Sequence, residues 1–402
     1  MSALGAVSGL AWLDALGPQR IRPGLTRTRS LLSSLGNPQS SFQSILIGGT
    51  NGKGSTAATI SALLAAAGVP CGLYTSPHLV SVTERVRLSD RDVSAATLDE
   101  VLRLVAAVAA PGLRGPTYFE ALTAAAFELF RRARVAVAVV EVGIGGRLDA
   151  TNVLSPDVSI VTNVGADHLD VLGPALEDVA REKAGIFRKG QPALLGASGT
   201  AAGARAALHA EARRIGARLV EIPPAADVAF ALPGAHQKQN LALALAAARA
   251  VAPLDEPAVK RGLAAVRWPG RLQRLEREGA RPLLLDGAHN PPGAAALAEH
   301  LDVTGLSGRV DLFFGGLRDK DLPGVFAPLA ARARRIVLVA PESPRAEKPE
   351  ALRARLGRPD LETADSVAEG LARLDGTDGD GPILVAGSLY LVGEVLRLRS
   401  RA

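Results

Sequence analysis

The chain has 402 residues, of which 48% are hydrophobic, a formal net charge of +6 and a single cysteine. This length exceeds one ordinary domain core, so two or three domains are expected. No apolar stretch is long enough for a membrane helix, the N-terminal residues do not resemble a signal peptide, and Cys71 cannot form an internal disulfide. We therefore expect a cytoplasmic protein that does not bind a membrane.

The positive charge raises the question of nucleic-acid binding. The arginines are scattered along the chain, however, and aromatic residues, which stack on bases, make up only 3% of it. A mildly positive protein also attracts small anions such as nucleotides and polycarboxylates. We expect small anionic substrates and no nucleic acid.

From residue 44 onward, short aliphatic runs alternate with Ala- and Leu-rich stretches, which is typical of a parallel sheet covered by helices. Strands are predicted at 44–48, 135–142 and 158–162, because their nearly continuous apolar character suits strands buried on both faces. Apolar residues spaced for a helix lie between the first two: Phe119, Leu122, Ala126 and Leu129. The predicted fold class is α/β.

A glycine-rich turn follows the first predicted strand in the segment SILIGGTNGKGSTAATISALLAAAG. Its four glycines allow backbone N–H groups to surround phosphate oxygens, and the helix that follows adds the partial positive charge of its N-terminus. Lys53 would then reach the β- and γ-phosphates. The common pattern G-x-x-x-x-G-K-[ST] is not met, because Gly54 follows Lys53. We interpret the segment as a variant phosphate loop rather than a plain strand-to-helix connection.

A carboxylate, Glu141, stands at the end of the second predicted strand, directly before the glycine-rich stretch GIGGRLDATN. Ligands of parallel sheets bind at the carboxyl ends of strands. A hard oxygen ligand there suits Mg²⁺ that bridges nucleotide phosphates. The alternative is a solvated glutamate at a strand end.

Asp167 and His168 follow the third predicted strand, and Lys183 lies on a predicted helix. With Glu141 in the same sheet, His168 is favoured as a ligand of a second metal over a packed histidine. A cationic Lys183 would be repelled by two metals. Burial could keep its amine neutral and let it react with CO₂ to form an anionic carbamate.

The regular pattern breaks at RWPGR, residues 267–271, and strands are predicted again at 282–285, 310–314, 336–339 and 383–385. We therefore place a domain boundary at residue 270. A phosphate-loop domain with a mainly parallel, doubly wound sheet is predicted over 1–270, and a smaller Rossmann-like α/β domain over 271–402.

Several motifs spread over residues 48–394 resemble those of the folylpolyglutamate synthase/dihydrofolate synthase family, which belongs to the muramyl ligase superfamily. They are GGTNGKGS, SPHL, TYFE, EVGIGGRLDATN, DH, REKAGI, HQ with Asn240, PGR, DGAHNP, DKD and GSLYLVGE. TNGKGS, GGRLDATN and DGAHNP point to the folate branch.

The resemblance implies roles for individual residues. The implied ATP contacts are Asn51, Gly52, Lys53, Gly54, Ser55, Asn240, Arg271 and Asp286. The implied Mg²⁺ ligands are Ser76, Glu141 and His168, and Lys183 matches the carbamylated lysine. Lys53, Lys183, His168 and Arg271 are expected to act in catalysis, with two Mg²⁺ ions and K⁺ as cations.

The resemblance also implies a pterin-substrate site and a glutamate site. The implied pterin-site residues are Gly24, Leu25, Thr26, Arg27, Thr117, Tyr118, Phe119, Leu148, Asp149 and Ala150. Arg85, His289 and Ser388 are the candidates for binding glutamate. Their structural alternatives are a surface ion pair for Arg85, a helix-start hydrogen bond for His289 and a helix cap for Ser388.

Together these features predict a monomeric ATP-dependent ligase that adds L-glutamate to dihydropteroate and to the γ-carboxyl of reduced folates through an acyl phosphate. The alternatives are folylpolyglutamate synthesis alone, another Mur-type amino-acid ligase, or a P-loop regulatory or transport ATPase. The intact TYFE and GGRLDATN segments favour both folate activities, and DGAHNP argues against a simple ATPase.

Overall fold

The computed structural model describes residues 8–18, 20–110, 115–226, 228–376 and 378–399. They separate into two compact units. Unit 1 consists of the described residues of Met1–His78, Val82–Ala231 and Lys238–Val266, and unit 2 of those of Leu79–Ser81, Leu232–Gln237 and Arg267–Ala402. The last segment of unit 2 begins close to the predicted boundary at residue 270. Unit 2 also includes two short segments from earlier in the chain, Leu79–Ser81 and Leu232–Gln237.

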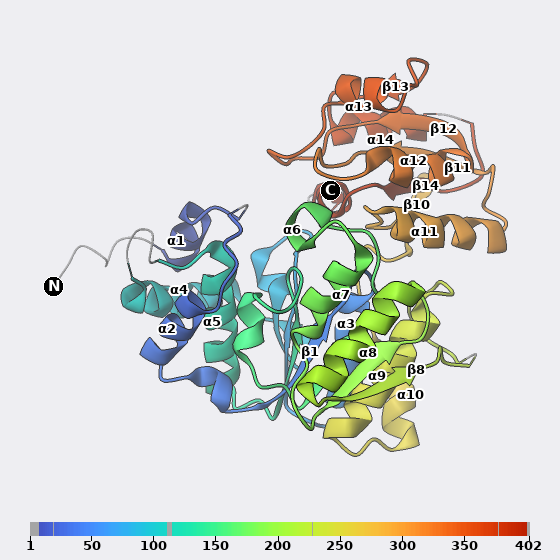
Figure 1. Ribbon diagram of the computed structural model, residues 1–402. Helices are drawn as coiled ribbons and strands as arrows, with labels where there is room; N and C mark the ends of the chain where they lie inside the picture. The colour runs from blue at the N-terminus through green and yellow to red at the C-terminus, as the bar shows by residue number, and fades with distance from the viewer. Residues whose placement is uncertain (1–7, 19, 111–114, 227, 377, 400–402) are drawn as a thin grey trace. The chain divides into compact units, whose positions relative to one another are not determined.

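Unit 1 contains an eight-stranded sheet with the order β4-β3-β2-β5-β1-β6-β7-β8. Figure 1 labels β1 and β8 of this sheet. The pairs that involve β3 are antiparallel, and all the others are parallel. The strands are β1 Gln43–Gly48, β2 Cys71–Tyr74, β3 Val86–Leu88, β4 Arg91–Asp92, β5 Val137–Glu141, β6 Val158–Val161, β7 Pro192–Gly196 and β8 Arg218–Ile222. Since β1 lies near the centre of this sheet, the loop that follows it is flanked by the ends of β5 and β6.

Helices cover both faces of this sheet. The helices are α1 Gly9–Ala15, α2 Thr26–Ser34, α3 Lys53–Ala66, α4 Ala95–Val108, α5 Tyr118–Arg132, α6 Leu169–Leu172, α7 Leu176–Ala184, α8 Ala202–Ile215, α9 Gln237–Val251 and α10 Glu256–Ala265, with 3-10 turns η2 Pro38–Ser40, η3 Val82–Arg85 and η5 Ala150–Val153. Leu46 of β1 packs in one core with α1, α2, α4, α5, α7 and α8. Since side chains alternate along a strand, Ile45 and Ile47 face the other side.

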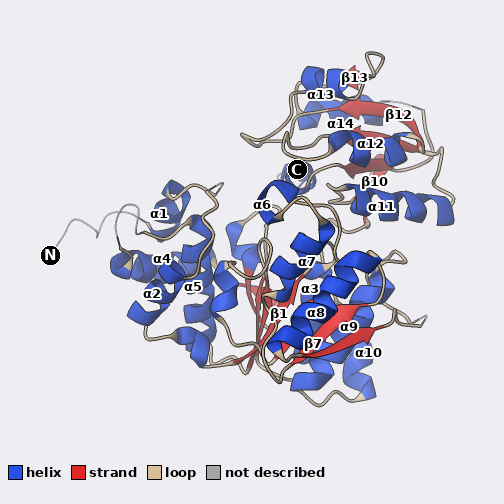
Figure 2. Ribbon diagram, in the orientation of Figure 1, coloured by secondary structure: helices blue, strands red, loops and turns tan. Residues whose placement is uncertain are grey.

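Unit 2 contains a six-stranded sheet with the order β13-β12-β11-β14-β10-β9, in which only the β9–β10 pair is antiparallel. Its elements are β9 Gln273–Arg277, β10 Ala280–Leu285, α11 Pro291–Val303, β11 Val310–Phe314, α12 Leu322–Ala330, β12 Ala333–Leu338, α13 Pro349–Arg355, β13 Glu362–Thr363, α14 Val367–Asp375, β14 Ile383–Ala386 and α15 Leu389–Arg399. One core joins the sheet to α11, α12 and α13, and the other joins it to α14 and α15 (Figure 2). The predicted α/β class with two mainly parallel sheets is confirmed.

Several predicted strands match the observed ones closely. The predicted strand 310–314 coincides with β11, and those at 44–48, 158–162 and 383–385 differ from β1, β6 and β14 by one residue at one end. Lys183 lies on α7, as expected. In the part of the chain that the structure describes, no helix has both the length and the apolar character needed to cross a membrane.

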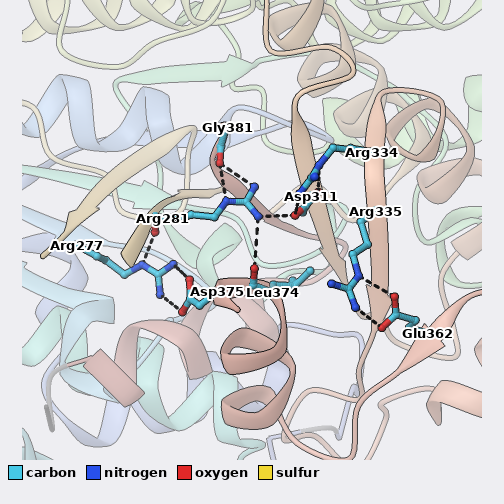
Figure 3. Close-up of polar contacts among 9 residues, drawn as sticks. All are labelled: Arg277, Arg281, Asp311, Arg334, Arg335, Glu362, Leu374, Asp375 and Gly381. Atoms are coloured by element: carbon cyan, nitrogen blue, oxygen red, sulfur yellow. Dashed lines mark hydrogen bonds and ion pairs between the residues drawn. The ribbon is translucent and has the colours of Figure 1, made fainter. Parts of the chain in front are cut away.

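A network of arginines and carboxylates links the strands of unit 2 (Figure 3). Asp311 of β11 is fully buried, and it accepts hydrogen bonds from Arg281 of β10 and from Nε and Nη2 of Arg334 of β12, the latter two at 3.0 and 2.8 Å. Burial alone would raise the pKa of Asp311, but the hydrogen bonds from Arg334 and Arg281 lower it below its ordinary value. The negative charge of the buried carboxylate is thus compensated by guanidinium groups from strands β10 and β12.

We predict that Asp311→Asn destabilises unit 2 by about 3–5 kcal/mol, because the buried ion pairs of Arg281 and Arg334 with this carboxylate are broken. The control is Asp380→Asn, which breaks an exposed pair with Arg309 and should cost under about 1 kcal/mol. Chemical denaturation measures both changes. Equal costs for the two variants would contradict a role for Asp311 in stability.

Candidate functional site

The phosphate loop joins the end of β1 to the start of α3. Gly49 and Gly52 have φ angles of 142° and 83°, which side chains rarely adopt. A Cβ atom on Gly49 would lie 1.8 Å from Oγ1 of Thr162, and one on Gly52 would lie 2.2 Å from Oδ1 of Asn240. Any larger residue at either position would have a strained backbone and would clash with its neighbour.

Two residues after β6 hold the loop in place. The Oγ1 of Thr162 donates to the carbonyl of Asn51 at 2.6 Å, and Oδ1 of Asn163 accepts from the Asn51 amide at 3.0 Å. The amide of Thr50 also donates to the backbone oxygen of Asn163 at 3.0 Å. Sequence reasoning missed Thr162 and Asn163; the only signal was two polar residues at the end of a predicted buried strand.

Two lysines meet at this loop. Nζ of Lys53 donates to the carbonyls of Gly49 and Thr50, each at 3.1 Å, and Nζ of Lys183 donates to the same Gly49 carbonyl at 2.9 Å. Among the described residues, neither lysine forms an ion pair with a carboxylate. Burial, followed by the charge of Lys53, lowers the pKa of Lys183 to about 7, while Asp167 opposes the shift. Two lysine amines thus lie against the loop, and the amine of Lys183 on α7 is the one that loses its proton easily.

The predicted metal ligands Glu141 and Ser76 lie together. Glu141 ends β5, Ser76 follows the neighbouring strand β2, and Oε2 of Glu141 accepts a hydrogen bond from the Ser76 amide at 3.1 Å. Glu141 is only 4% exposed. The alternative of a solvated strand-end glutamate is therefore wrong.

The third predicted ligand, His168, directly precedes α6 in a left-handed conformation with φ 53° and ψ 37°. Its Nε2 lies 3.8 Å from Oδ1 of Asp167, and its side chain is 30% exposed, so it is not a packed core histidine. Within the described ranges, no three His, Cys, Asp or Glu side chains cluster closely enough to hold a metal. The predicted set contains only two such residues, Glu141 and His168, and relies on Ser76 and phosphate oxygens for the rest.

The predicted nucleotide contacts of unit 1 surround the loop. Gly54 and Ser55 are buried in the first turn of α3, and Asn240 of α9 lies against Gly52. Gln239, which sequence reasoning missed, holds this end of α9: its Oε1 accepts from the Ser198 amide at 3.1 Å, and its Nε2 donates to the Ile222 carbonyl at 2.8 Å. Gln239 thereby fixes the position of Asn240 relative to the sheet.

The three segments predicted to form a pterin site are joined in the structure. The Gly24 amide donates to the Leu148 carbonyl at 3.2 Å, which links the first and third segments. Arg27 of α2 pairs with Glu120 of α5 through Nη2–Oε1 at 2.8 Å and Nε–Oε2 at 3.1 Å, which links the first and second. Glu120, in the TYFE motif, was not among the predicted residues; its role in joining the segments needed the folded structure.

Individual side chains of these segments have structural tasks. Thr117 caps α5 by accepting from the Glu120 amide, and Phe119 stacks on Tyr74 with ring centroids 5.8 Å apart. Asp149 accepts hydrogen bonds from the amides of Gly143 and Ile144, both at 3.1 Å. Burial raises the pKa of Asp149, although hydrogen bonds, first that from Thr151, oppose the rise. The remaining members are Leu25 at the start of α2, Thr26 in its first turn, Tyr118 at the start of α5, Ala150 in η5 and a partly exposed Leu148.

Arg85 is buried at the end of η3, with 9% exposure. Its Nε donates to Nδ1 of His78 at 2.9 Å, and its Cζ lies 5.5 Å from the centroid of the Tyr118 ring. The alternative of a surface ion pair is therefore wrong.

The predicted residues of unit 2 gather at the end of β10. Asp286 accepts from the amides of Leu272 and Ala288, both at 2.9 Å, and the Gly287 amide donates to the Gly270 carbonyl. Arg271 is held beside Gly287, because a Cβ there would lie 2.6 Å from its Nη1. The DGAHNP and PGR motifs therefore meet within unit 2.

The two glutamate candidates of unit 2 lie near this point. Nδ1 of His289 contacts the Gly287 carbonyl at 2.8 Å, while the side chain of Asn290 caps α11. Ser388 precedes α15, and its Oγ accepts from the Tyr390 amide at 3.1 Å, as expected for a helix cap. The Gly387 amide donates to the Ala288 carbonyl, which connects the two motifs.

Comparison with known families gives two matches. Residues 47–200 match the Mur ligase middle domain, and residues 270–389 match the Mur ligase glutamate ligase domain.

Two named relatives resemble nearly the whole chain. The dihydrofolate synthase/folylpolyglutamate synthase of Escherichia coli is 35% identical over 97% of this chain and 94% of its own length. The probable bifunctional folylpolyglutamate synthase/dihydropteroate synthase of Haloferax volcanii is 36% identical over 95% of this chain. This chain spans about half the length of that protein, 49%, and of a similar relative from Halobacterium salinarum, 51%.

Solved structures give the same result. E. coli FolC in complex with DHPP and ADP has 32% identity and a TM-score of 0.89, with 98% of each chain covered. A bifunctional folylpolyglutamate synthase/dihydrofolate synthase with Mn, AMPPNP and L-glutamate bound has 31% identity and a TM-score of 0.87, again with 98% of each chain covered. The chain therefore belongs to the Mur ligase family, in its folylpolyglutamate synthase/dihydrofolate synthase branch.

Proposed function

We propose that this chain is an ATP-dependent ligase that adds L-glutamate to dihydropteroate and to the γ-carboxyl of reduced folates. It would work in the cytoplasm as a monomer, with Mg²⁺ and K⁺ as cations. The observation that carries the proposal is the pair Lys53 and Lys183, which share one carbonyl of a glycine-rich loop and, within the described ranges, form no ion pair with a carboxylate. Such uncompensated charge at a helix N-terminus suits a polyphosphate.

The surroundings of the loop support a carboxylate substrate, the phosphoryl acceptor, beside that polyphosphate. The loop follows β1, Glu141 ends β5, and Leu148 lies in the loop after β5, so all three lie at the carboxyl edge of one sheet. Leu148 is joined to Gly24, within the segments that match the pterin site of the family. A nucleotide and a carboxylic acid can therefore be held by neighbouring loops.

The residues present fit a divalent metal ion. Glu141 offers a buried carboxylate and Ser76 a hydroxyl, which together with phosphate oxygens make a suitable hard oxygen donor set, and His168 would add one imidazole nitrogen from a partly exposed ring. When bound, Mg²⁺ would neutralise charge on the transferring phosphoryl group.

The proposed reaction proceeds in two steps. A carboxylate oxygen of the folate substrate attacks the γ-phosphorus of ATP, and the bond to ADP breaks; Lys53 stabilises the charge that develops on the phosphoryl oxygens. The amine of glutamate then attacks the acyl-phosphate carbonyl, phosphate leaves and a proton is released. Arg271, Asn240 and Asp286 are the proposed nucleotide contacts, and His289, Ser388 and Arg85 the proposed glutamate contacts. No nucleophilic side chain is required.

We further propose that Lys183 is carbamylated. The residue is 4% exposed and the pKa of its amine is lowered to about 7, so the neutral, CO₂-reactive form is available near neutral pH. The carbamate would turn a repelling cation beside Lys53 into an anion that supports the metal ions.

The proposed reaction can be tested with its own substrates. With ATP, Mg²⁺, K⁺ and L-glutamate, the protein should release ADP in the presence of dihydropteroate or of tetrahydrofolate, each offered separately. Mass spectrometry should show one added glutamyl residue for each ADP. ADP release without an amide product would favour a simple ATPase, and activity with tetrahydrofolate alone would restrict the function to tail extension.

The proposed metal site can be tested through Glu141. Glu141→Gln should raise the Mg²⁺ concentration needed for half-maximal rate by at least about 10- to 100-fold, the usual cost of losing even a residue that supports a metal ligand. The control is Glu100→Gln, which alters a side chain that is 64% exposed. An unchanged Mg²⁺ titration for the Glu141 variant would remove this residue from the metal site.

The proposed carbamate can be tested by replacing Lys183. Lys183→Ala should abolish turnover and regain part of it with added short-chain carboxylates, whereas Lys189→Ala, at an exposed position, should not change the rate. Below pH 7 the wild-type amine is protonated and cannot bind CO₂, so carbamate and rate should rise as the pH increases through about 7. Full activity of the Ala variant would refute the carbamate.

A further inference from the structure

Arg85 is a buried cation to which the described part of the chain supplies no counter-ion. Its backbone is fixed because its carbonyl accepts from the Thr75 amide at 3.0 Å, and the residue is 9% exposed. Buried arginines are normally paired with carboxylates. Among the residues that the structure describes, however, no Asp or Glu side chain forms an ion pair with Arg85.

The two groups that hold Arg85 carry no negative charge. A guanidinium only donates hydrogen bonds, so Nδ1 of His78, at 2.9 Å from Nε, must accept, and the imidazole is neutral with its proton on Nε2. On another side, Cζ lies 5.5 Å from the centre of the Tyr118 ring, a distance at which the ring attracts a cation through its π face. These two contacts orient the guanidinium group of Arg85 and leave its positive charge uncompensated by His78 or Tyr118.

Other arginines of unit 1 show the contrast. Arg27 forms a two-point pair with Glu120, and Arg131 and Arg132 share Glu128. The Arg27 pair joins α2 to α5, and the pairs with Glu128 lie within α5, but each of these guanidinium groups has a carboxylate partner. Arg85 is held instead by one hydrogen bond and one aromatic face, and none of the described residues accepts a hydrogen bond from its Nη groups.

We propose that His78 and Tyr118 are positioning residues that orient Arg85 without neutralising it, so that its guanidinium binds a carboxylate of the incoming amino-acid substrate. This inference rests on the proposed glutamate ligase function and adds two residues to it. A neutral acceptor at position 78 is the essential feature: a carboxylate there would hold Arg85 equally well but would compete with the substrate for its charge.

The test compares His78→Asn with His78→Asp. The Oδ1 of either side chain takes the position of Nδ1, so both variants offer Arg85 an acceptor and differ chiefly in charge. We expect the Asn variant to stay within about threefold of the wild-type KM for glutamate. The Asp variant should raise this KM at least about tenfold, the scale of a lost hydrogen bond to a charged group, with the KM for ATP unchanged.

Thermal unfolding separates binding from folding. The Asp variant should be at least as stable as the Asn variant, because it pairs a buried cation. Arg87→Gln, which breaks a pair with Asp92 on the neighbouring strand, is the matched control and should leave the KM for glutamate unchanged.

Two results would overturn the proposal. Equal KM values for glutamate in the Asp and Asn variants would show that the charge of Arg85 is not used, and a tenfold rise in the Asn variant would show that a neutral acceptor does not suffice. If the wild-type protein forms no glutamyl amide, the proposed function fails instead. These outcomes are distinguishable because the His78 variants are compared only after wild-type turnover is measured.

Discussion

The carbonyl of Gly49 accepts hydrogen bonds from two lysines, and the chemistry proposed for this chain depends on that contact. Burial disfavours the charged form of Lys183, and repulsion from the ammonium group of Lys53 adds to this effect, so the pKa of Lys183 falls to about 7. The loop can hold both amines because Gly49 and Gly52 adopt backbone conformations that leave room for Thr162 and Asn240. A polyphosphate and a carbamate are two anions that would relieve the repulsion.

Charges in this molecule fall into two groups with different consequences. In unit 2, the buried Asp311 is paired with Arg281 and Arg334, so the charge of the buried carboxylate is compensated by cations from other strands of the sheet (Figure 3). In unit 1, Lys53, Lys183 and Arg85 are fixed by carbonyls, a neutral imidazole or an aromatic face. Holding a cation with neutral groups preserves its attraction for anionic substrates. The same principle therefore links the phosphate loop to the proposed glutamate contact.

Sequence patterns predicted the elements whose signals are local. The apolar runs of β1, β6 and β11 and the glycine-rich loop were identified because each carries its information within a few residues. The parallel strands β2, β7, β8 and β13 and the antiparallel strands β3, β4 and β9 were not predicted; short strands with polar residues, such as QRLER, are defined by their partners. The Gly52–Asn240 contact and the Arg27–Glu120 pair connect distant segments and needed the fold. A single boundary at residue 270 also could not anticipate that Leu79–Ser81 and Leu232–Gln237 belong to unit 2.

The central claim is that this protein activates a substrate carboxylate as an acyl phosphate before glutamate attacks. Oxygen tracing tests it most directly: dihydropteroate labelled with ¹⁸O in its carboxyl group is converted with unlabelled ATP, and the released phosphate is analysed by mass spectrometry. An acyl phosphate transfers one carboxylate oxygen to phosphorus, so each phosphate should carry one ¹⁸O atom. Amide formation with unlabelled phosphate would contradict the account.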